Sequence, residues 1–307
     1  MACRRTSCTM RGLLVFDLPS PLAVVCHDAG AANLILAWLD ETALPGVRAV
    51  MEGPAARLWE NRFGSHFTRL TLDEALHGAA SVLSGTGWGG DVEHRARQRA
   101  RELAIPSVAV IDHWVNYADR FLRSGTIVLP DVFWVTDEYA LLEARRCFPG
   151  YPIRLRENRY LLQQLAQIAP VTETDAGEVL YALEPARAEW GRGTPGEFQA
   201  LDFLADHLRE AGLAADAHIR LRPHPSDPPG KYQRWMQEHP RLHTSLDDSP
   251  DIARSVSRAR WVAGCESFAL VIALGAGRNV ICTLPPWAPA CRLPHSGMIH
   301  LKHRVHG

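Results

Sequence analysis

The chain has 307 residues, of which 47% are hydrophobic and 22% are charged. Its 33 Lys and Arg residues nearly balance 34 Asp and Glu residues, which gives a formal net charge of -1 at pH 7. At roughly 100–200 residues per domain this length predicts two domains, and the charge balance argues against a protein that binds nucleic acid by neutralising phosphates.

Neither a membrane span nor a secretory leader is expected. The apolar stretches are interrupted by Asp17 and two nearby prolines, or by Arg278, well short of the ~20 residues that cross a bilayer. The 7 cysteines are scattered without a Cys-x-x-Cys pair, which argues for a reducing compartment and against a disulfide framework or a thiolate zinc site. We therefore expect a cytoplasmic protein without an integral membrane segment, and peripheral membrane association is left open.

The first half of the chain alternates strand-like and helical patterns. Strands are expected at Leu22–Cys26, Val47–Met51, Ser81–Ser84, Ser107–Asp112 and Val132–Val135, and helices at Ala31–Leu39, Ala55–Phe63, Val92–Leu103 and Glu138–Cys147. Such alternation is typical of a parallel sheet covered by helices. The polar or glycine-rich turns after these strands therefore lie along one edge of one sheet.

A helical pattern over Arg159–Ile168 and a polar linker over Ala169–Gly177 separate the halves. The second half then predicts strands at Val179–Leu183, His218–Leu221, Trp261–Ala263 and Val280–Thr283, a short segment at Leu242–Ser245, and helices at Pro195–Ala211, Lys231–Glu238, Pro250–Ser257 and Ser267–Leu274. The fold class is α/β, with two tandem Rossmann-like doubly wound domains over residues 1–170 and 171–307. A central cleft between them is the expected ligand site.

A proline-locked turn follows the expected strand at His218–Leu221. Its sequence, Arg222-Pro223-His224-Pro225-Ser226, fixes the backbone so that the side chains of Arg222 and His224 leave the strand end in defined directions. A guanidinium and an imidazole placed in this way suit a diphosphate or phosphodiester, with Ser226 beside them. The alternative is a turn without a ligand.

A glycine turn follows the expected strand at Trp261–Ala263 and places Glu266 and Ser267 at the start of a helix. Backbone amides there suit a phosphate, Ser267 adds a hydroxyl donor, and Glu266 is able to accept from ribose hydroxyls. The alternative is that Ser267 only caps the helix. A further loop, Glu184-Pro185-Ala186-Arg187 with the glycines after it, is placed to close over a donor phosphate.

Together these two turns resemble the C-terminal half of GT-B glycosyltransferases of bacterial surface-polysaccharide type. The His-Pro families concerned are sialyltransferases and capsule polymerases, Kdo transferases, and CDP-glycerol transferases. The resemblance implies that His224 and Ser267 contact the phosphate of a donor nucleotide. The chain departs from these families in one place, because Cys265-Glu266-Ser267 stands where paired serines are frequent.

The turns of the first half supply candidate acid–base and wall residues. His27 or Asp28 is the candidate general base for an acceptor hydroxyl, unless Asp28 only caps the following helix. Gly87 and Trp88 are expected to offer backbone amides and an aromatic face to the acceptor or donor. Asp112 and His113 are expected to form a sugar or nucleoside wall, although a packed loop would have a similar sequence.

Other charged segments are assigned no site. Asp91 and Glu93 fit the first turn of a helix, and its arginines, Arg95, Arg97, Arg99 and Arg101, are expected to form a solvated face. His300, His303 and His306 have no carboxylate beside them to complete a ligand set, so they are expected to be surface residues and no metal site is predicted.

The predicted activity is metal-independent transfer of a sugar from a nucleotide-activated donor, CMP- or UDP-linked, to a glycan, lipid or small-molecule acceptor, with no cofactor and no nucleic acid. The donor site would comprise the residues named above: Arg222, His224, Ser226, Glu266 and Ser267. Two alternatives stay open. One is a nucleotide-sugar 2-epimerase or hydrolase on the same scaffold, which needs no acceptor, and the other is a non-catalytic nucleotide-sugar-binding protein.

Overall fold

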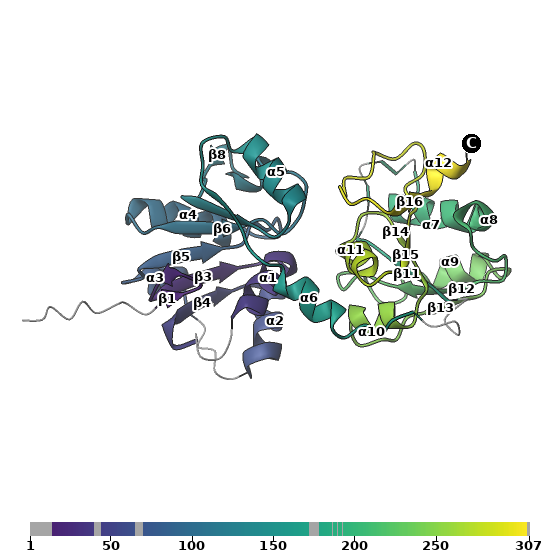
Figure 1. Cartoon of the computed structure of the whole chain (residues 1–307), viewed down its shortest axis with the longest axis horizontal. Helices are drawn as coiled ribbons and strands as arrows, with labels where there is room; N and C mark the ends of the chain where they lie inside the picture. Colours follow the sequence, from purple (N-terminus) through teal and green to yellow (C-terminus); the bar gives the residue numbers. More distant parts are fainter. Residues whose placement is uncertain are drawn as a thin grey trace, which may run out of the picture. The chain divides into compact units, whose positions relative to one another are not determined.

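The computed structural model describes residues 14–39, 44–64, 70–171, 178–185, 187–188, 190–191 and 193–305. The chain divides into two compact units, Met1–Tyr160 and Leu161–Gly307 (Figure 1). The division falls inside helix α6 (Arg159–Leu165), ahead of the boundary expected at residue 170. Residues 172–177 of the expected linker lie outside the described residues.

The first unit is built on a six-stranded sheet in the order β10-β9-β6-β5-β3-β4. Every neighbouring pair in this sheet is parallel. The strands are β3 (Leu22–Cys26), β4 (Val47–Met51), β5 (Ser81–Ser84), β6 (Ser107–Val110), β9 (Val132–Val135) and β10 (Ile153–Leu155). Because the chain goes from β3 outward to β4 and then back across to β5, the order reverses between β3 and β5. Doubly wound sheets bind ligands beyond the carboxyl ends of the strands at such a point.

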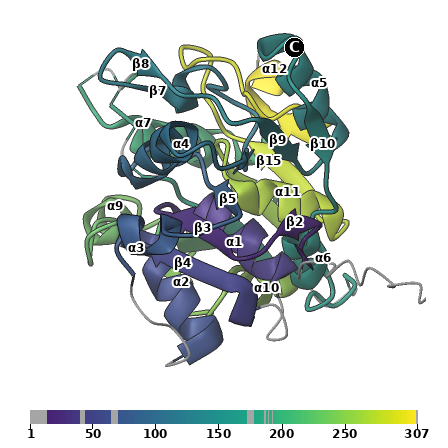
Figure 2. The ribbon, with the colours of Figure 1, turned by 90° about the vertical axis from the view of Figure 1, so that its left-hand side faces the viewer.

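Alternating residues of β3 reach two separate cores. Leu22, Val24 and Cys26 pack with α1 (Ala29–Trp38) and α2 (Gly53–Phe63). Ala23 and Val25 pack with α3 (Leu72–Leu76) and α4 (Val92–Glu102) on the opposite face. Figure 2 shows β5, β3 and β4 side by side with these helices around them. A strand buried on both faces reads as a continuous apolar run, and for that reason β3 was predictable.

The second unit repeats the architecture with the order β13-β12-β11-β14-β15-β16, again with every neighbouring pair parallel. Its strands are β11 (Glu178–Ala182), β12 (His218–Arg222), β13 (Thr244–Leu246), β14 (Trp261–Gly264), β15 (Asn279–Cys282) and β16 (Met298–His300). Its order reverses between β11 and β14. The predicted α/β class with two tandem doubly wound domains is confirmed, and the cleft between them stays a prediction.

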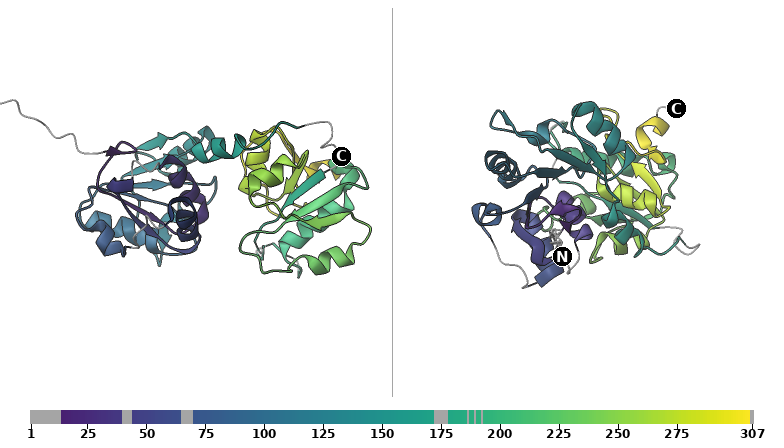
Figure 3. Two further views of the ribbon diagram at one scale, coloured as in Figure 1. Left: turned by 90° about the horizontal axis from the view of Figure 1, so that it is seen from below. Right: turned by 60° about the vertical axis from the view of Figure 1, so that its left-hand side comes forward.

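Helices lie on both sides of the second sheet (Figure 3). They are α7 (Gly196–Asp206), α8 (Leu208–Ala211), α9 (Gln233–Glu238), α10 (Ile252–Ser257), α11 (Phe268–Gly275) and α12 (Leu301–Val305). The single helix expected over Pro195–Ala211 is interrupted at His207, whose φ of -131° and ψ of 37° are not helical.

Several short elements were not expected from the sequence. In the first unit they are α3, β10 and two antiparallel hairpins, β1 (Leu14–Val15) with β2 (Leu18–Pro19) and β7 (Leu122–Arg123) with β8 (Thr126–Ile127). Helix α5 (Glu138–Cys147), by contrast, was predicted. In the second unit they are β16 and α12. Within the part of the chain that the structure describes, no helix has the length and apolar character needed to cross a membrane.

Candidate functional site

The turn after β3 carries a hydrogen-bonded pair of side chains. Nδ1 of His27 lies 2.6 Å from Oδ1 of Asp28. Oδ2 of Asp28 accepts hydrogen bonds from the backbone amides of Trp88 and of Gly89, the latter at 3.1 Å. The Asp28 side chain makes no capping hydrogen bond to the first turn of α1, whose residues are all described, so the capping alternative does not hold. Asp28 instead joins the turn after β3 to the turn after β5.

These contacts give the two side chains different chemical roles. Burial alone would raise the pKa of Asp28, but the hydrogen bonds from His27 and from the amides of Trp88 and Gly89 outweigh it and lower that pKa. The ionised carboxylate accepts the Nδ1 proton of His27, which leaves Nε2 as the imidazole atom that accepts a proton. Within the predicted pair, therefore, His27 suits the base and Asp28 suits its orientation.

Glycines surround the His27 ring because no larger residue fits. A Cβ atom on Gly53 or on Gly89 would lie 2.7 Å from Cε1 of His27, and one on Gly90 would lie 2.6 Å from Cδ2. The glycine-rich turn was expected to present its amides to a ligand. The amides of Gly87, Trp88 and Gly89 instead donate to the carboxylates of Glu93 and Asp28, so this turn holds those two side chains.

Glu93 is a buried carboxylate that the sequence assigned only to the first turn of a helix. It does stand in the first turn of α4, but its side chain is 2% exposed. Oε1 accepts from the amide of His27 at 3.1 Å, and Oε2 accepts from the amide of Gly87. Burial raises the pKa of Glu93 despite these hydrogen bonds and the nearby charge of Arg97. A buried carboxyl with a raised pKa, here bound to the backbone amide of His27, is a candidate functional group.

Arg97 corrects the expectation of a solvated arginine face on α4. Its side chain is 2% exposed and donates to Oγ of Ser84 at 3.1 Å, to the carbonyl of Gly85 at 2.9 Å and to the carbonyl of Val128 at 3.1 Å. The buried face of α4 comprises Val92, Glu93, His94, Ala96, Arg97 and Ala100. Arg97 therefore holds the turn after β5 from the buried face of α4. Its positive charge also acts on Glu93.

Asp112, after β6, lies against the start of α1. A Cβ atom on Gly30 would come within 1.7 Å of Oδ2 of Asp112. The Asp112 carboxylate pairs with Nη1 of buried Arg120 at 2.7 Å, and the same nitrogen lies 3.2 Å from the carbonyl of Thr86. The structure thus brings together the turns after β3, β5 and β6, as the sequence predicted.

Trp88 and His113, which were predicted to face a ligand, each lie beside another side chain. The indole of Trp88 is 49% exposed and is covered on one face by Arg123, whose guanidinium carbon is 5.4 Å from the ring centroid. The ring of His113 lies 5.1 Å from that of Trp114. The aromatic face expected of Trp88 for the acceptor or donor, and the sugar or nucleoside wall expected of Asp112 and His113, stay predictions.

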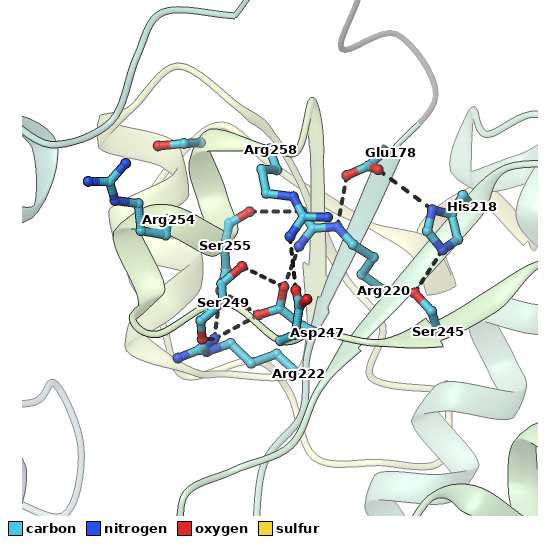
Figure 4. Close-up of polar contacts among 12 residues, drawn as sticks. Glu178, His218, Arg220, Arg222, Ser245, Asp247, Ser249, Arg254, Ser255 and Arg258 are labelled. Atoms are coloured by element: carbon cyan, nitrogen blue, oxygen red, sulfur yellow. Dashed lines mark hydrogen bonds and ion pairs between the residues drawn. The ribbon is translucent and has the colours of Figure 1, made fainter.

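In the second unit, Arg222 belongs to an ionic network on one face of the sheet (Figure 4). Its Nη1 donates to Oδ2 of Asp247 at 2.7 Å, to Oγ of Ser255 at 2.7 Å and to the carbonyl of Ser249 at 3.0 Å. Arg220 also binds the carboxylate of Asp247. The Nη1 group of Arg222 is therefore engaged with the protein itself, and the phosphate contact predicted for this residue stays a prediction.

His224 is oriented by the turn that the prolines fix. Its Nδ1 accepts from the amide of Ser226 at 3.2 Å and lies 2.7 Å from Oγ of Ser226. Burial lowers the pKa of His224, although Asp227 and Glu184 oppose that shift. A neutral imidazole that accepts at Nδ1 carries its proton on Nε2. His224 thus offers one hydrogen-bond donor, and Ser226 acts as its partner.

In the glycine turn after β14, Ser267 and Glu266 both contact the protein itself, and the nucleotide contacts expected of them stay predictions. Oγ of Ser267 accepts from the amide of Ala269 at 3.2 Å, so Ser267 caps α11. Glu266 is 6% exposed and forms a salt bridge with Nη2 of Arg292 at 2.7 Å. Burial alone would raise the pKa of Glu266, but the hydrogen bonds and charge of Arg292 lower it.

Further charged residues surround these two turns. Glu184 pairs with Arg187 and accepts from the amide of Glu266. Lys231 bridges Oδ1 of Asp227 at 2.7 Å and Oε1 of Glu197 at 2.9 Å. The sequence indicated Arg187 by its place after β11. It gave no signal for Arg292, whose partner Glu266 is distant in the chain, or for Lys231, which joins nearby Asp227 to distant Glu197.

Comparisons with known proteins establish the fold. No family model and no curated protein matches the chain. The structure of S. aureus MnaA with UDP matches with a TM-score of 0.56 at 11% identity, covering 85% of this chain and 78% of that one. UDP-GlcNAc 2-epimerase of Neisseria meningitidis bound to UDP-GlcNAc matches with a TM-score of 0.55 at 11% identity, covering 89% and 84%. The chain has a GT-B-like fold.

A third solved structure has a similar fold. UDP-GlcNAc 2-epimerase of Methanocaldococcus jannaschii matches the GT-B-like chain with a TM-score of 0.54 at 11% identity, covering 85% of this chain and 83% of that one. At such identities the likeness concerns the fold alone. The resemblance to surface-polysaccharide families stays a prediction.

Proposed function

We propose that this chain is an enzyme that cleaves the bond between the anomeric carbon and the diphosphate of a UDP-linked sugar without a separate acceptor, as a 2-epimerase or hydrolase. The observation that carries the proposal is the His27–Asp28 pair, held beside buried Glu93 at the carboxyl edge of the first sheet. The solved structures reported above support the epimerase alternative over a glycosyltransferase, since they are UDP-GlcNAc 2-epimerases or are bound to UDP.

The proposed reaction requires a general base and stabilisation of the departing diphosphate. The general base comes first. Epimerisation at C-2 requires a proton to leave that carbon while the C1–O bond breaks and its electrons depart with the nucleoside diphosphate. Return of a proton and of the diphosphate to the resulting double bond gives the 2-epimer. Nε2 of His27 would remove the proton, or would take one from water in hydrolysis.

The second requirement is stabilisation of the departing diphosphate. His224 would donate from Nε2, and the amides at the start of α11, which Ser267 caps, would contribute further donors. Arg187 and Arg292 would supply positive charge, although both are paired with carboxylates in the structure. These groups would stabilise the diphosphate without a metal ion, so we expect that the reaction requires neither Mg²⁺ nor Mn²⁺.

The test is a proton NMR time course in D₂O with UDP-GlcNAc alone and, in parallel, with other UDP-, CDP-, GDP- and CMP-linked sugars. An epimerase yields the 2-epimer with deuterium at C-2, and a hydrolase yields the free sugar and the nucleotide. A donor that is stable alone but consumed when a glycan or lipid acceptor is added would overturn the proposal in favour of a glycosyltransferase. Binding without turnover in either condition would favour a non-catalytic binding protein.

A further inference from the structure

Two thiols and one imidazole meet near the carboxyl edge of the second sheet. Sγ of Cys282, Sγ of Cys291 and a ring nitrogen of His300 all lie within 4.8 Å of one another. Cys282 ends β15 and His300 ends β16, and these two residues are register partners in the parallel pair. Register partners on adjacent parallel strands point to the same face. Cys291 comes from the loop between the two strands.

We propose that Cys282, Cys291 and His300 bind one Zn²⁺ ion, with water as the fourth ligand. This site is independent of the function proposed above. It also reverses the expectation from the sequence, where the scattered cysteines argued against zinc and His300 was taken as a surface residue. The spacing along the chain concealed the site because the three ligands converge only through the pairing of β15 with β16.

The ligand set selects the metal. Thiolate sulfur and imidazole nitrogen favour Zn²⁺, whereas Mg²⁺, Ca²⁺ and Mn²⁺ favour oxygen ligands. Zinc–sulfur bonds of about 2.3 Å in a tetrahedral site place two sulfur atoms about 3.8 Å apart. The observed limit of 4.8 Å between ligand atoms requires only a small inward movement to reach that geometry. Binding displaces the thiol protons, so the affinity for Zn²⁺ should fall as the pH is lowered.

The two thiols lie near one backbone carbonyl oxygen. Sγ of Cys282 lies 3.3 Å from the carbonyl oxygen of Cys265, and Sγ of Cys291 lies 3.9 Å from the same oxygen. Cys282 is 2% exposed, whereas Cys291 and His300 are half-buried. An ion is therefore able to enter from solvent on the side of Cys291 and His300, where a water molecule completes its coordination.

The ion would hold the loop of Cys291 and Arg292, which contacts the glycine turn after β14. Arg292 follows Cys291 directly, and both its backbone amide, at 2.6 Å, and its guanidinium bind the carboxylate of Glu266. Zinc on Cys291 would hold this loop against β15 and β16. The ion therefore has a structural role, in which it keeps Arg292 in place on Glu266.

The test uses the full chain, reduced, stripped of metal and titrated with Co²⁺ without oxygen. Co²⁺ bound by thiolates gives a charge-transfer absorption in the near ultraviolet, and one equivalent of Zn²⁺ should abolish it. The Cys291→Ser and His300→Ala variants should each weaken Zn²⁺ affinity at least about 100-fold, more than loss of an outer partner of a ligand costs. Cys147→Ser, at a half-buried cysteine of the first unit, should bind as the unaltered chain does.

Circular dichroism establishes that each variant is folded, and the use of two half-buried positions avoids dependence on buried Cys282. Absence of the charge-transfer band in the reduced chain would overturn the proposal. So would equal affinity in Cys291→Ser, His300→Ala and Cys147→Ser. A disulfide between Cys282 and Cys291 that persists under reduction and excludes Co²⁺ would also overturn it.

Discussion

The Nδ1 atom of His27 lies 2.6 Å from Oδ1 of Asp28. This contact suggests different roles for two residues that the sequence left as equal candidates for the general base. Asp28 receives three hydrogen-bond donors, from the His27 ring and from two backbone amides of the turn after β5. A carboxylate bound in this way is a weak base and a good orienting group. The free nitrogen of the pair, Nε2 of His27, is the atom suited to proton transfer.

The first prediction concerns His27→Ala and Asp28→Asn. Loss of a general base typically lowers turnover by ~10²–10⁴-fold, so His27→Ala should reduce kcat in that range with little change in the Kd for UDP. Asp28→Asn should also lower kcat. In addition it should reduce the free energy of unfolding, because the amides of Trp88 and Gly89 lose a charged acceptor. Steady-state kinetics, calorimetric titration with UDP and urea unfolding measure the three quantities.

His77→Ala and Asp73→Asn are matched controls in the same unit, since His77 is exposed and the side chain of Asp73 is 83% exposed. Both should leave kcat and stability unchanged. Wild-type turnover in His27→Ala would show that the base does not lie in this turn. Asp112 or His113 would then be the next candidate.

The second prediction concerns nucleotide binding by the proline-locked turn. His224→Ala removes a hydrogen bond to a charged group, worth about 1.5–3 kcal/mol, and should weaken UDP affinity at least about tenfold. His224→Gln retains an N–H donor and should recover part of that affinity. The thermal shift that UDP produces in each variant provides the measurement. If Ala and Gln variants bind UDP as tightly as the original chain, His224 does not contact the nucleotide.

The third prediction concerns the packing of Gly30 on Asp112. Alanine is favoured over glycine within a helix by about 1 kcal/mol, but a Cβ atom at Gly30 would lie 1.7 Å from Oδ2 of Asp112. Gly30→Ala should therefore destabilise the first unit by about 1–3 kcal/mol, as overpacking does. Urea unfolding of Gly30→Ala alone and in the Asp112→Ala background forms a double-mutant cycle. Equal costs in the two backgrounds would show that the clash is absent.

Local sequence patterns were sufficient for most of the sheet framework. Leu22–Cys26 is expected and observed as a strand because it is apolar throughout and buried on both faces. Val47–Met51 and Ser81–Ser84 are also expected and observed as strands, although the first contains Arg48 and the second begins and ends with serine. The turns after these strands were placed on one edge by topology alone, and the structure brings His27, Asp28 and Gly87 together there.

Contacts between distant parts of the chain could not be read in this way. Arg97 stands among alternating arginines that look solvated, yet α4 turns it onto the buried end of β5. Glu93 and the partner of Arg222, Asp247, are recognisable only when strands and helices are paired in space. Strand β16 is short and half-buried, so its pairing with β15, and with it the meeting of Cys282 and His300, had no local signal.

The last prediction follows from Asp247, whose side chain is fully buried between Arg220 and Arg222 (Figure 4). Burial alone would raise the pKa of Asp247, but hydrogen bonds from Ser255, Arg222 and Ser249 and the charge of Arg220 lower it. Because the folded pKa is below the unfolded value of about 3.9, the carboxylate contributes its full stability above that pH. This contribution is lost as the pH falls through the folded pKa.

Asp247→Asn keeps the shape but leaves the buried guanidinium of Arg220 and the half-buried one of Arg222 without their shared anion. Removing one partner of a buried ion pair typically costs about 3–5 kcal/mol, so the free energy of unfolding of the second unit at pH 7 should fall by that order. The decline in stability between about pH 5 and pH 3 should also become shallower. Asp248→Asn is the matched control, since the side chain of Asp248 is 86% exposed and pairs with exposed Arg258, which predicts a loss of about 0–1 kcal/mol. Urea unfolding from pH 7 to pH 3 compares the two variants, and parallel pH profiles for Asp247→Asn and the original chain would show that this carboxylate does not titrate with folding.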